Sequence, residues 1–226
     1  ISSVNSMITA VNSYLKWAGQ AEFSIHTCRV QKQIFRENSR ELGKEEYYRL
    51  LNAAVSEKRE RLSGILRTIA ATGMRIGELR YLTVETLSRQ KIEIHFKGKQ
   101  RVILMARSLV IFLRDYCRRN RITSGIIFAT KNGNPVDRRN IWAEMKELCE
   151  PARVLPSKVF PHNLRHLFAR CFYERERDLV RLADYLGHSS IETTRRYTMI
   201  TSEEACAREL ELGLAGNESW GGAEKK

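Results

Sequence analysis

Apolar residues spaced three and four positions apart recur along most of the sequence, and one short stretch of strict alternation interrupts them. The first spacing puts apolar side chains on one face of a helix, whereas alternation puts them on one face of a strand. Residues 91–96 alternate, Val102 and Leu104 alternate again, and the Lys-Gly-Lys-Gln break between them predicts a β-hairpin with a cationic tip. We therefore predict a mainly α-helical fold with one small antiparallel β-sheet, of the α+β class. Helices are expected at about 2–18, 44–56, 62–70, 75–82, 107–120, 138–150, 162–174, 177–186 and 190–198.

The two ends of the chain differ from its middle. Residues 2–18 predict an amphipathic helix that cannot bury its apolar face alone, and the polar stretch that follows to about Arg40 shows no clear period. The length of 226 residues suits one ordinary domain with a fragment of another. We expect a main domain at 41–200, with the end of another domain plus a linker at 1–40 and a C-terminal tail at 201–226.

Positive charge dominates the composition. The sequence holds 39 Lys plus Arg against 26 Asp plus Glu, and residues 89–121 alone hold ten cations against Glu93 and Asp115. Lysines and arginines that neutralise phosphates release condensed counterions, so this excess favours a nucleic acid partner and makes residues 89–121 a candidate phosphate-tracking surface. A basic face that is merely solvated is the alternative.

Other classes of protein fit the sequence poorly. No apolar run reaches the roughly 20 residues that a membrane-spanning helix needs, and no signal segment opens the chain. We therefore expect neither membrane insertion nor secretion. Five cysteines are scattered without a Cys-x-x-Cys pair, which favours buried thiols in a reducing compartment over disulfides or zinc ligands.

Three local motifs stand apart from the apolar pattern. They are Thr-Gly-Met-Arg-Ile-Gly-Glu-Leu at 72–79, His-Asn-Leu-Arg-His at 162–166, and Leu-Gly-His at 186–188, which Tyr197 follows nine residues later. Each has an ordinary structural explanation when taken singly: an ion pair on a helix surface, hydrogen-bonded histidines, or an aromatic residue of the core.

The two histidines of the second motif would share a helix face, as they do in His-Glu-x-x-His zinc sites. However, Asn163 stands where such a site has its general-base glutamate, a third ligand is hard to nominate, and Arg165 would lie beside the metal. We therefore expect no metal and no cofactor.

Together and in this order, the three motifs and the downstream tyrosine resemble the catalytic domain of the tyrosine recombinases, the phage-integrase family of site-specific DNA recombinases. The resemblance covers about residues 42–200 and implies that family's catalytic-domain fold. It also implies that residues 1–40 are the end of an N-terminal DNA-clamping (core-binding) domain plus its linker. The tail at 201–226 is expected to be exchanged between protomers, with folding back in cis as the alternative.

The resemblance implies a catalytic role for each motif. Tyr197 matches the nucleophile that forms a 3′-phosphotyrosyl link, and a phenol with a pKa of about 10 needs a general base, which His162 matches. Arg75, Arg165 and His188 match the groups that hold the non-bridging phosphate oxygens, a task that suits the planar guanidinium fork.

Further residues are expected to support these groups. Lys97 at the hairpin tip matches the lysine that protonates the leaving 5′-oxygen, and Lys99 is the competing candidate. Lys99 and Arg101 are also expected to contact DNA. Glu78 matches a residue that orients the first arginine, and His166 is expected to be structural.

The implied function is that of a metal-independent, site-specific DNA recombinase or integrase that serves a mobile genetic element. Its expected partners are double-stranded DNA, further copies in a homotetramer on paired DNA sites, and accessory DNA-bending or directionality proteins. Its expected location is the cytoplasm of a bacterial or archaeal cell, at the nucleoid. Two alternatives stay open: a type IB topoisomerase-like activity that relaxes one duplex, and a non-catalytic DNA-binding module of the same fold.

Overall fold

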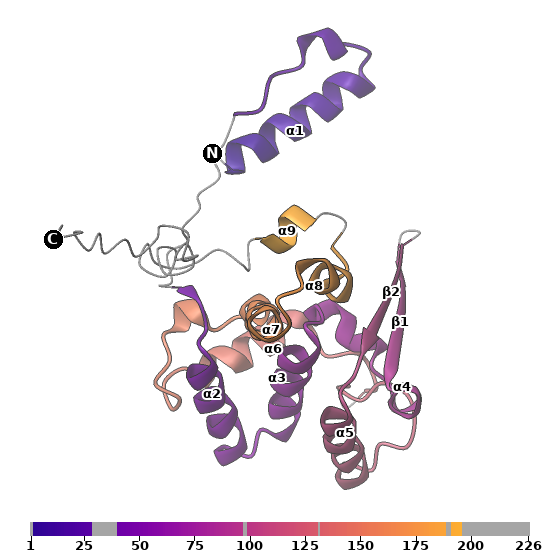
Figure 1. Cartoon of the computed structure of the whole chain (residues 1–226), viewed down its shortest axis with the longest axis vertical. Helices are drawn as coiled ribbons and strands as arrows, with labels where there is room; N and C mark the ends of the chain where they lie inside the picture. The colour runs from indigo at the N-terminus through magenta and orange to yellow at the C-terminus, as the bar shows by residue number, and fades with distance from the viewer. Residues whose placement is uncertain (1, 29–39, 97–98, 131, 189–190, 196–226) are drawn as a thin grey trace, which may run out of the picture. The chain divides into compact units, whose positions relative to one another are not determined.

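The structure is a computed structural model that describes residues 2–28, 40–96, 99–130, 132–188 and 191–195. The chain divides into two compact units, one formed by Ile1–Arg36 with Ser202–Lys226 and the other by Glu37–Thr201. Figure 1 shows the elements of both units. No helix in the described part of the chain is long and apolar enough to cross a membrane.

The described residues of the smaller unit, 2–28, form an α-helix and an extended segment that returns along it. Helix α1 spans Ser2–Trp17, and the 3₁₀ turn η1 spans Ala21–Phe23. The Asn12 side chain on α1 donates to the carbonyl of Ile25 and accepts from its N–H, both at 2.8 Å, and so ties the extended segment to the helix. The apolar side chains of α1 stay largely exposed. The described residues of this unit therefore leave the apolar face uncovered, as the sequence predicted for a lone amphipathic helix.

In the larger unit, helix α3 forms the centre of the core. Helices α2, α5, α6 and α7 all pack against it. Gly64 in the middle of α3 lets the ring of Phe128 approach closely, since a Cβ at that position would lie 2.8 Å from a ring carbon. The elements of this unit are α2 (Lys44–Ser56), α3 (Glu60–Thr72), η3 (Ile76–Tyr81), α4 (Val84–Arg89), β1 (Lys91–Phe96), β2 (Lys99–Leu104), α5 (Arg107–Arg119), α6 (Arg138–Glu147), η4 (Pro156–Lys158), α7 (Pro161–Glu176), α8 (Leu179–Leu186) and α9 (Ile191–Arg195).

Strands β1 and β2 form the predicted antiparallel hairpin, but its apolar face differs from the prediction. Ile92 pairs with Ile103, and both are buried. Val102 and Leu104, which marked the second strand in the sequence pattern, are instead exposed by 39% and 52%. Residues paired directly across two strands lie on the same face of the sheet, so the buried Ile92 selects Ile103.

Among the described residues the fold is mainly helical with one two-stranded antiparallel sheet, which confirms the predicted class. Residues 76–81 form the 3₁₀ helix η3 where the sequence suggested an ordinary short helix. Helix α4 was not expected, because it is only six residues long and buries Leu87 alone. Residues 196–198 of the last expected helix lie outside the described residues.

Candidate active site

A cleft of about 1370 Å³ lies between η3, the hairpin, the start of α7 and the end of α8. It collects side chains from all three sequence motifs, so that Arg75 and His188 line the same cleft although they lie far apart in the sequence. Six predicted site residues line it: Arg75, Glu78, Arg101, His162, Arg165 and His188. The fold thus brings together groups that the sequence analysis could connect only through a resemblance.

Arg75 reaches the cleft because α3 ends one turn earlier. Gly73 ends that helix with a left-handed backbone (φ 63°), and a Cβ there would lie 2.4 Å from the Phe168 ring. The chain then enters η3, where a carboxylate oxygen of Glu78 accepts from the Arg75 backbone N–H at 2.7 Å. The other oxygen accepts from the Arg75 guanidinium at 3.0 Å. Glu78 therefore holds both ends of Arg75, while 48% of the arginine side chain remains exposed at the cleft.

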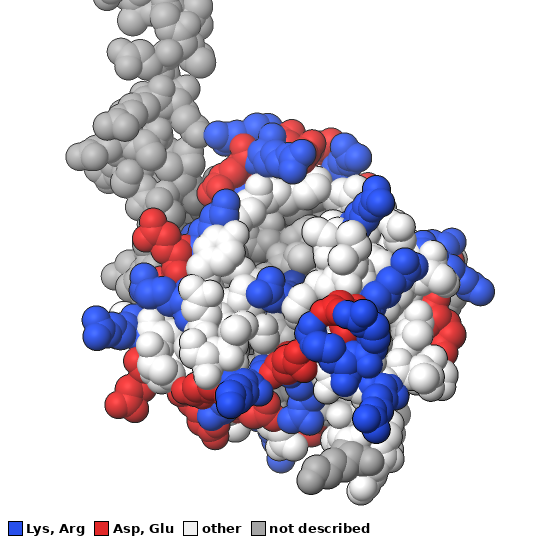
Figure 2. All heavy atoms as spheres, turned by 90° about the horizontal axis from the view of Figure 1, so that it is seen from below, with Lys and Arg blue, Asp and Glu red and all other residues white. Residues whose placement is uncertain are grey.

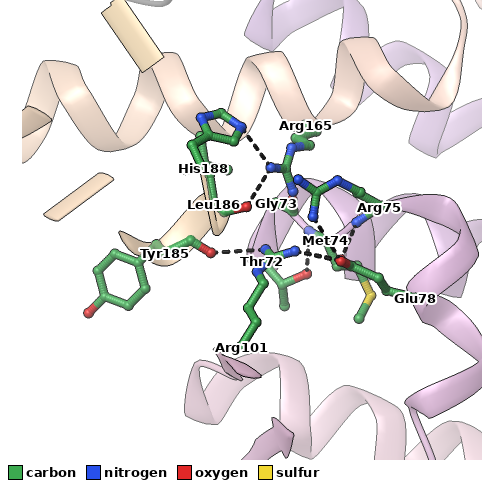
Figure 3. A network of polar contacts seen from close by, with 10 residues as sticks. All are labelled: Thr72, Gly73, Met74, Arg75, Glu78, Arg101, Arg165, Tyr185, Leu186 and His188. Atoms are coloured by element: carbon green, nitrogen blue, oxygen red, sulfur yellow. Dashed lines mark hydrogen bonds and ion pairs between the residues drawn. The ribbon is translucent and has the colours of Figure 1, made fainter. Parts of the chain in front are cut away.

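Arg101 reaches the same carboxylate from β2 (Figure 3). Its Nη1 lies 2.7 Å from both carboxylate oxygens of Glu78, and its Nη2 donates to the carbonyl of Tyr185 at 2.9 Å. The side chain is 9% exposed, and burial together with the nearby Arg75 lowers the pKa of Arg101. The structure therefore shows Arg101 bound to protein groups, and the expected contact of Arg101 with DNA stays a prediction.

Gly187 provides the space that Arg101 occupies. Helix α8 ends at Gly187 with a left-handed backbone (φ 61°), and a Cβ there would lie 2.5 Å from Cδ of Arg101. The glycine of the Leu-Gly-His motif thus serves two purposes, since it ends the helix and admits the arginine side chain from the hairpin. This contact links β2 to the segment that carries His188.

Arg165 is the most enclosed charged group of the cleft, with 1% exposure. Its Nη1 donates to the carbonyl of Gly73 at 2.6 Å, and its Nη2 donates to the carbonyl of Leu186 at 2.6 Å. These carbonyls lie at the C-terminal ends of α3 and α8, where the partial negative charge of a helix stabilises a cation. The buried guanidinium therefore joins two helix ends and is held rigidly at the edge of the cleft (Figure 3).

His188 lies beside this guanidinium. Its Nε2 is 3.0 Å from Nη2 of Arg165, and its Nδ1 is 2.8 Å from the hydroxyl of Thr194 on α9. Burial lowers the pKa of His188 to about 4, and the neighbouring cations Arg165, Arg75 and Arg101 act in the same direction, as does His162. The ring is therefore neutral at physiological pH. Thr194 carried no signal in the sequence analysis and is a contact that only the structure reveals.

The two histidines of α7 differ in their surroundings. His162 is exposed at the cleft, whereas His166 is 7% exposed one turn further on. Their rings meet edge to face with centroids 4.6 Å apart. Within the described ranges, no group of three His, Cys, Asp or Glu residues is arranged to hold a metal ion.

Several predicted groups fall outside this description. Lys97 and Tyr197 lie outside the described residues, and only the backbone of Lys99 is described, at the start of β2. Their predicted roles stay predictions. In the sequence, Lys97 lies between the two strands of the hairpin, whose second strand carries Arg101. Tyr197 follows the buried Thr194 by three positions in the sequence.

The basic segment at 89–121 is partly neutralised by ion pairs. On α5, Arg118 binds Asp115 at 2.6 Å, and Arg119 binds both Asp115 and, at 2.7 Å, Glu60 of α3. The face at the lower end of Figure 1, seen in Figure 2, accordingly shows blue and red side chains interspersed, with no continuous basic band. For these residues of α5, a solvated and ion-paired helix face fits better than a phosphate-tracking surface.

Comparisons of the sequence with known proteins agree on one group. The family model described as the phage integrase family matches residues 40–204. Tyrosine recombinase XerA of Pyrococcus furiosus is 30% identical over 213 residues, which cover 90% of this chain and 71% of that protein. Tyrosine recombinase XerD of Vibrio cholerae is 30% identical over 148 residues, which cover 62% of this chain and 49% of that protein.

Solved structures resemble the chain in the same way. The crystal structure of XerA recombinase matches with a TM-score of 0.64 and 27% identity, over 92% of this chain and 74% of the other. A lambda integrase dimer bound to a COC′ core site matches with a TM-score of 0.64 and 19% identity, over 87% of this chain and 72% of the other. At 19% identity, the similarity to lambda integrase shows a shared fold alone. That protein was solved bound to DNA.

Proposed function

Because the chain belongs to the phage integrase family, the tyrosine recombinases, we propose that it cleaves and rejoins DNA at specific sites through a 3′-phosphotyrosyl intermediate on Tyr197. One observation carries the proposal. Arg75, Arg165 and His188 come from three separate elements and line one open cleft. Two guanidinium groups beside an accessible cavity form a site for one phosphodiester, because guanidinium cations donate hydrogen bonds to phosphate oxygens and offset their negative charge.

The arginines have different tasks in this reaction. Arg165 is fixed by helix-end carbonyls before any ligand arrives, so it stabilises charge on the phosphorane without a cost of reorganisation. Arg75 is half-exposed, so its guanidinium can turn toward the phosphate when DNA binds. Charge that develops on the non-bridging oxygens is thereby met by cations that the fold holds near each other.

The covalent step exchanges one phosphoester for another. The phenolic oxygen of Tyr197 attacks phosphorus and gives its proton to His162, while the bond to the 5′-oxygen breaks and Lys97 protonates that oxygen. The energy of the broken bond is kept in the phosphotyrosyl link, so a 5′-hydroxyl of another strand can reverse the step. For Tyr197 and Lys97 the proposal is supported by motif spacing and family membership.

We propose double-stranded DNA as the substrate and a homotetramer on paired sites as the working assembly, in the service of a mobile genetic element. Residues 41–200 would be the catalytic domain, which the compact unit Glu37–Thr201 supports. Residues 1–40 would complete a DNA clamp, and residues 201–226 would pass to a neighbouring protomer. The basic composition supports a polyanionic partner.

The decisive experiment traps a covalent adduct. The chain is incubated with a randomised pool of DNA duplexes, SDS-resistant protein–DNA adducts are isolated, and the attached DNA is sequenced and remade as a duplex nicked next to the scissile phosphate. We expect a 3′-linked adduct that Tyr197→Phe abolishes while DNA affinity is retained. Tyr185→Phe, which changes a tyrosine that lines the cleft, is the matched control and should leave the adduct intact.

Three results would contradict the proposal. They are an adduct that survives Tyr197→Phe, a linkage to the 5′ end of DNA, and the failure of any duplex in the pool to become attached. Relaxation of a supercoiled plasmid without junctions between paired sites would indicate the topoisomerase alternative. Sequence-selective DNA binding with no adduct would indicate the non-catalytic module.

A further inference from the structure

The ring nitrogen of His188 that lies beside Arg165 carries no proton in the free protein, whereas holding a phosphate oxygen requires an N–H donor. A guanidinium only donates, so Nε2 of His188, 3.0 Å from Nη2 of Arg165, must carry a lone pair. In a neutral imidazole the proton then resides on Nδ1, which donates to the Thr194 hydroxyl at 2.8 Å. A ring in this tautomer cannot donate from Nε2 to a phosphate oxygen.

Two routes could give Nε2 a proton. The ring could become a cation, but burial and the neighbouring groups Arg165, Arg75, Arg101 and His162, which lower its pKa to about 4 in the free protein, oppose a further positive charge. Alternatively, the neutral ring could change tautomer, losing the proton at Nδ1 and gaining one at Nε2 by exchange with water. This second route leaves the net charge unchanged, and it needs a partner at Nδ1 that can donate as well as accept.

The Thr194 hydroxyl meets that need, because a hydroxyl is both a donor and an acceptor. Thr194 is completely buried, so its orientation is set by the protein. We propose that Thr194 is a positioning residue that accepts from Nδ1–H of His188 in the free protein and donates to Nδ1 once a phosphate occupies the cleft, so that neutral His188 donates to the phosphate from Nε2. This inference rests on the proposed function, since it assumes a phosphodiester beside His188.

The same hydroxyl links the pocket to the nucleophile's segment. Thr194 belongs to α9 and precedes Tyr197 by three positions, whereas His188 follows the end of α8. The hydrogen bond therefore joins the phosphate-binding group to the part of the chain that leads to the tyrosine. Loss of the hydroxyl should affect bond cleavage more than DNA affinity, which is set by contacts with many phosphates.

The test uses three variants of the whole chain. Thr194→Val keeps the shape of the side chain and removes the hydroxyl, Thr194→Ser keeps the hydroxyl, and Thr193→Val changes the exposed neighbour as a control. We expect Thr194→Val to slow single-turnover cleavage of the trapped duplex by about tenfold or more with little change in Kd, as for loss of a buried hydrogen-bond partner. Thr194→Ser and Thr193→Val should stay within about threefold of the parent.

Nitrogen-15 NMR of labelled histidine reports which ring nitrogen of His188 carries the proton. A merely structural role of Thr194 would leave that property of the complex unchanged. In the free protein we expect His188 to carry its proton on Nδ1 in the parent and in Thr194→Val alike, because Arg165 fixes the lone pair at Nε2. Thr194→Val should instead lower the fraction of rings protonated on Nε2 once DNA is bound. In the Tyr197→Phe protein bound to the trapped duplex we expect a neutral ring protonated on Nε2. Thermal melting of each variant separates loss of folding from loss of the hydrogen bond.

The proposal fails if His188 is an imidazolium in the complex, if Thr194→Val cleaves as fast as the parent, or if Thr194→Ser is as slow as Thr194→Val. A free protein in which Nδ1 lacks the proton would also overturn it. These outcomes differ from failure of the proposed function, in which the parent chain attaches to no DNA. In that case the free-protein spectra still decide which ring nitrogen of His188 carries the proton.

Discussion

The carboxylate of Glu78 lies closer to the guanidinium of Arg101 than to the guanidinium of Arg75. Both carboxylate oxygens of Glu78 lie 2.7 Å from Nη1 of Arg101, whereas Nη1 of Arg75 lies 3.0 Å from one of them. The buried cation from β2 thus contacts both carboxylate oxygens, whereas the half-exposed guanidinium of Arg75 contacts one and can turn toward a ligand. The motif residue expected to orient an arginine also attaches the hairpin to the cleft.

We predict that Glu78→Gln lowers the free energy of unfolding by about 2 kcal/mol, because it leaves Arg101 enclosed without a negative partner. Urea denaturation measures the change. Glu150→Gln, at an exposed position after α6, is the control and should change stability by less than about 0.5 kcal/mol. Equal effects of the two substitutions would show that Arg101 does not depend on the Glu78 charge.

The space at Gly187 gives a second prediction. In Gly187→Ala the new Cβ would sit on a left-handed backbone and would also contact the Arg101 side chain. In Gly125→Ala the backbone is left-handed as well (φ 74°), but no atom lies within 4 Å of the new Cβ. Backbone strain alone costs about 1 kcal/mol, so we expect Gly125→Ala to lose about that much and Gly187→Ala to lose at least about 1 kcal/mol more. Thermal or urea unfolding measures both.

The double variant identifies the cause of that difference. In an Arg101→Ala background the contact is absent, so Gly187→Ala should cost about as much as Gly125→Ala. If Gly187→Ala instead cost the same extra amount with and without the Arg101 side chain, the close approach of the two residues would not explain the effect.

Much of the fold was accessible from the sequence because it rests on local periodicity. The stripe at 62–70 and the alternation at 91–96 depend on neighbours within one or two turns, and they match α3 and β1. Apolar residues alone did not identify the buried face of β2. Ile103 is selected by its partner Ile92 across the hairpin, which is a contact between strands.

The candidate site was predictable only in part, for a related reason. The motifs identified Arg75, Arg165 and His188, which the fold brings to one cleft. Arg101 looked like one more cation of a basic hairpin, because nothing near it in sequence indicates its carboxylate partner 23 positions away. Thr194 was missed because a single threonine in a polar segment has no periodic signature, and its importance arises from its contact with a histidine.

His188 predicts a dependence of stability on pH. Its pKa is about 4 in the folded chain and about 6.5 when exposed, so between these values the unfolded state binds more protons. The free energy of unfolding is therefore highest above pH 6.5, and it falls as the pH falls from 6.5 toward 4. The full difference corresponds to at most about 3 kcal/mol, and screening by solvent makes the measured amount smaller.

Urea unfolding at several pH values between 4 and 7 measures this contribution. The parent should lose more stability than His188→Gln over that range, because glutamine has no titrating proton there. His26→Gln, at an exposed position of the smaller unit, should keep the parent's slope. Parallel curves for the parent and His188→Gln would contradict the assignment of a neutral, half-buried ring.

Arg165 provides the last prediction, because its guanidinium does what no single ammonium can do. It spans the carbonyls of Gly73 and Leu186 with two different nitrogens, each at 2.6 Å. Arg165→Lys keeps the charge but can reach only one of these helix ends well, so a buried carbonyl is left without its donor. We expect a loss of about 2 kcal/mol in the free energy of unfolding and a fall of at least about a hundredfold in the rate of adduct formation. Arg175→Lys on the same helix, with its side chain 85% exposed, should change neither quantity appreciably. If Arg165→Lys were as stable and as fast as the parent, the bridging geometry would be irrelevant, and positive charge alone would account for the role of residue 165.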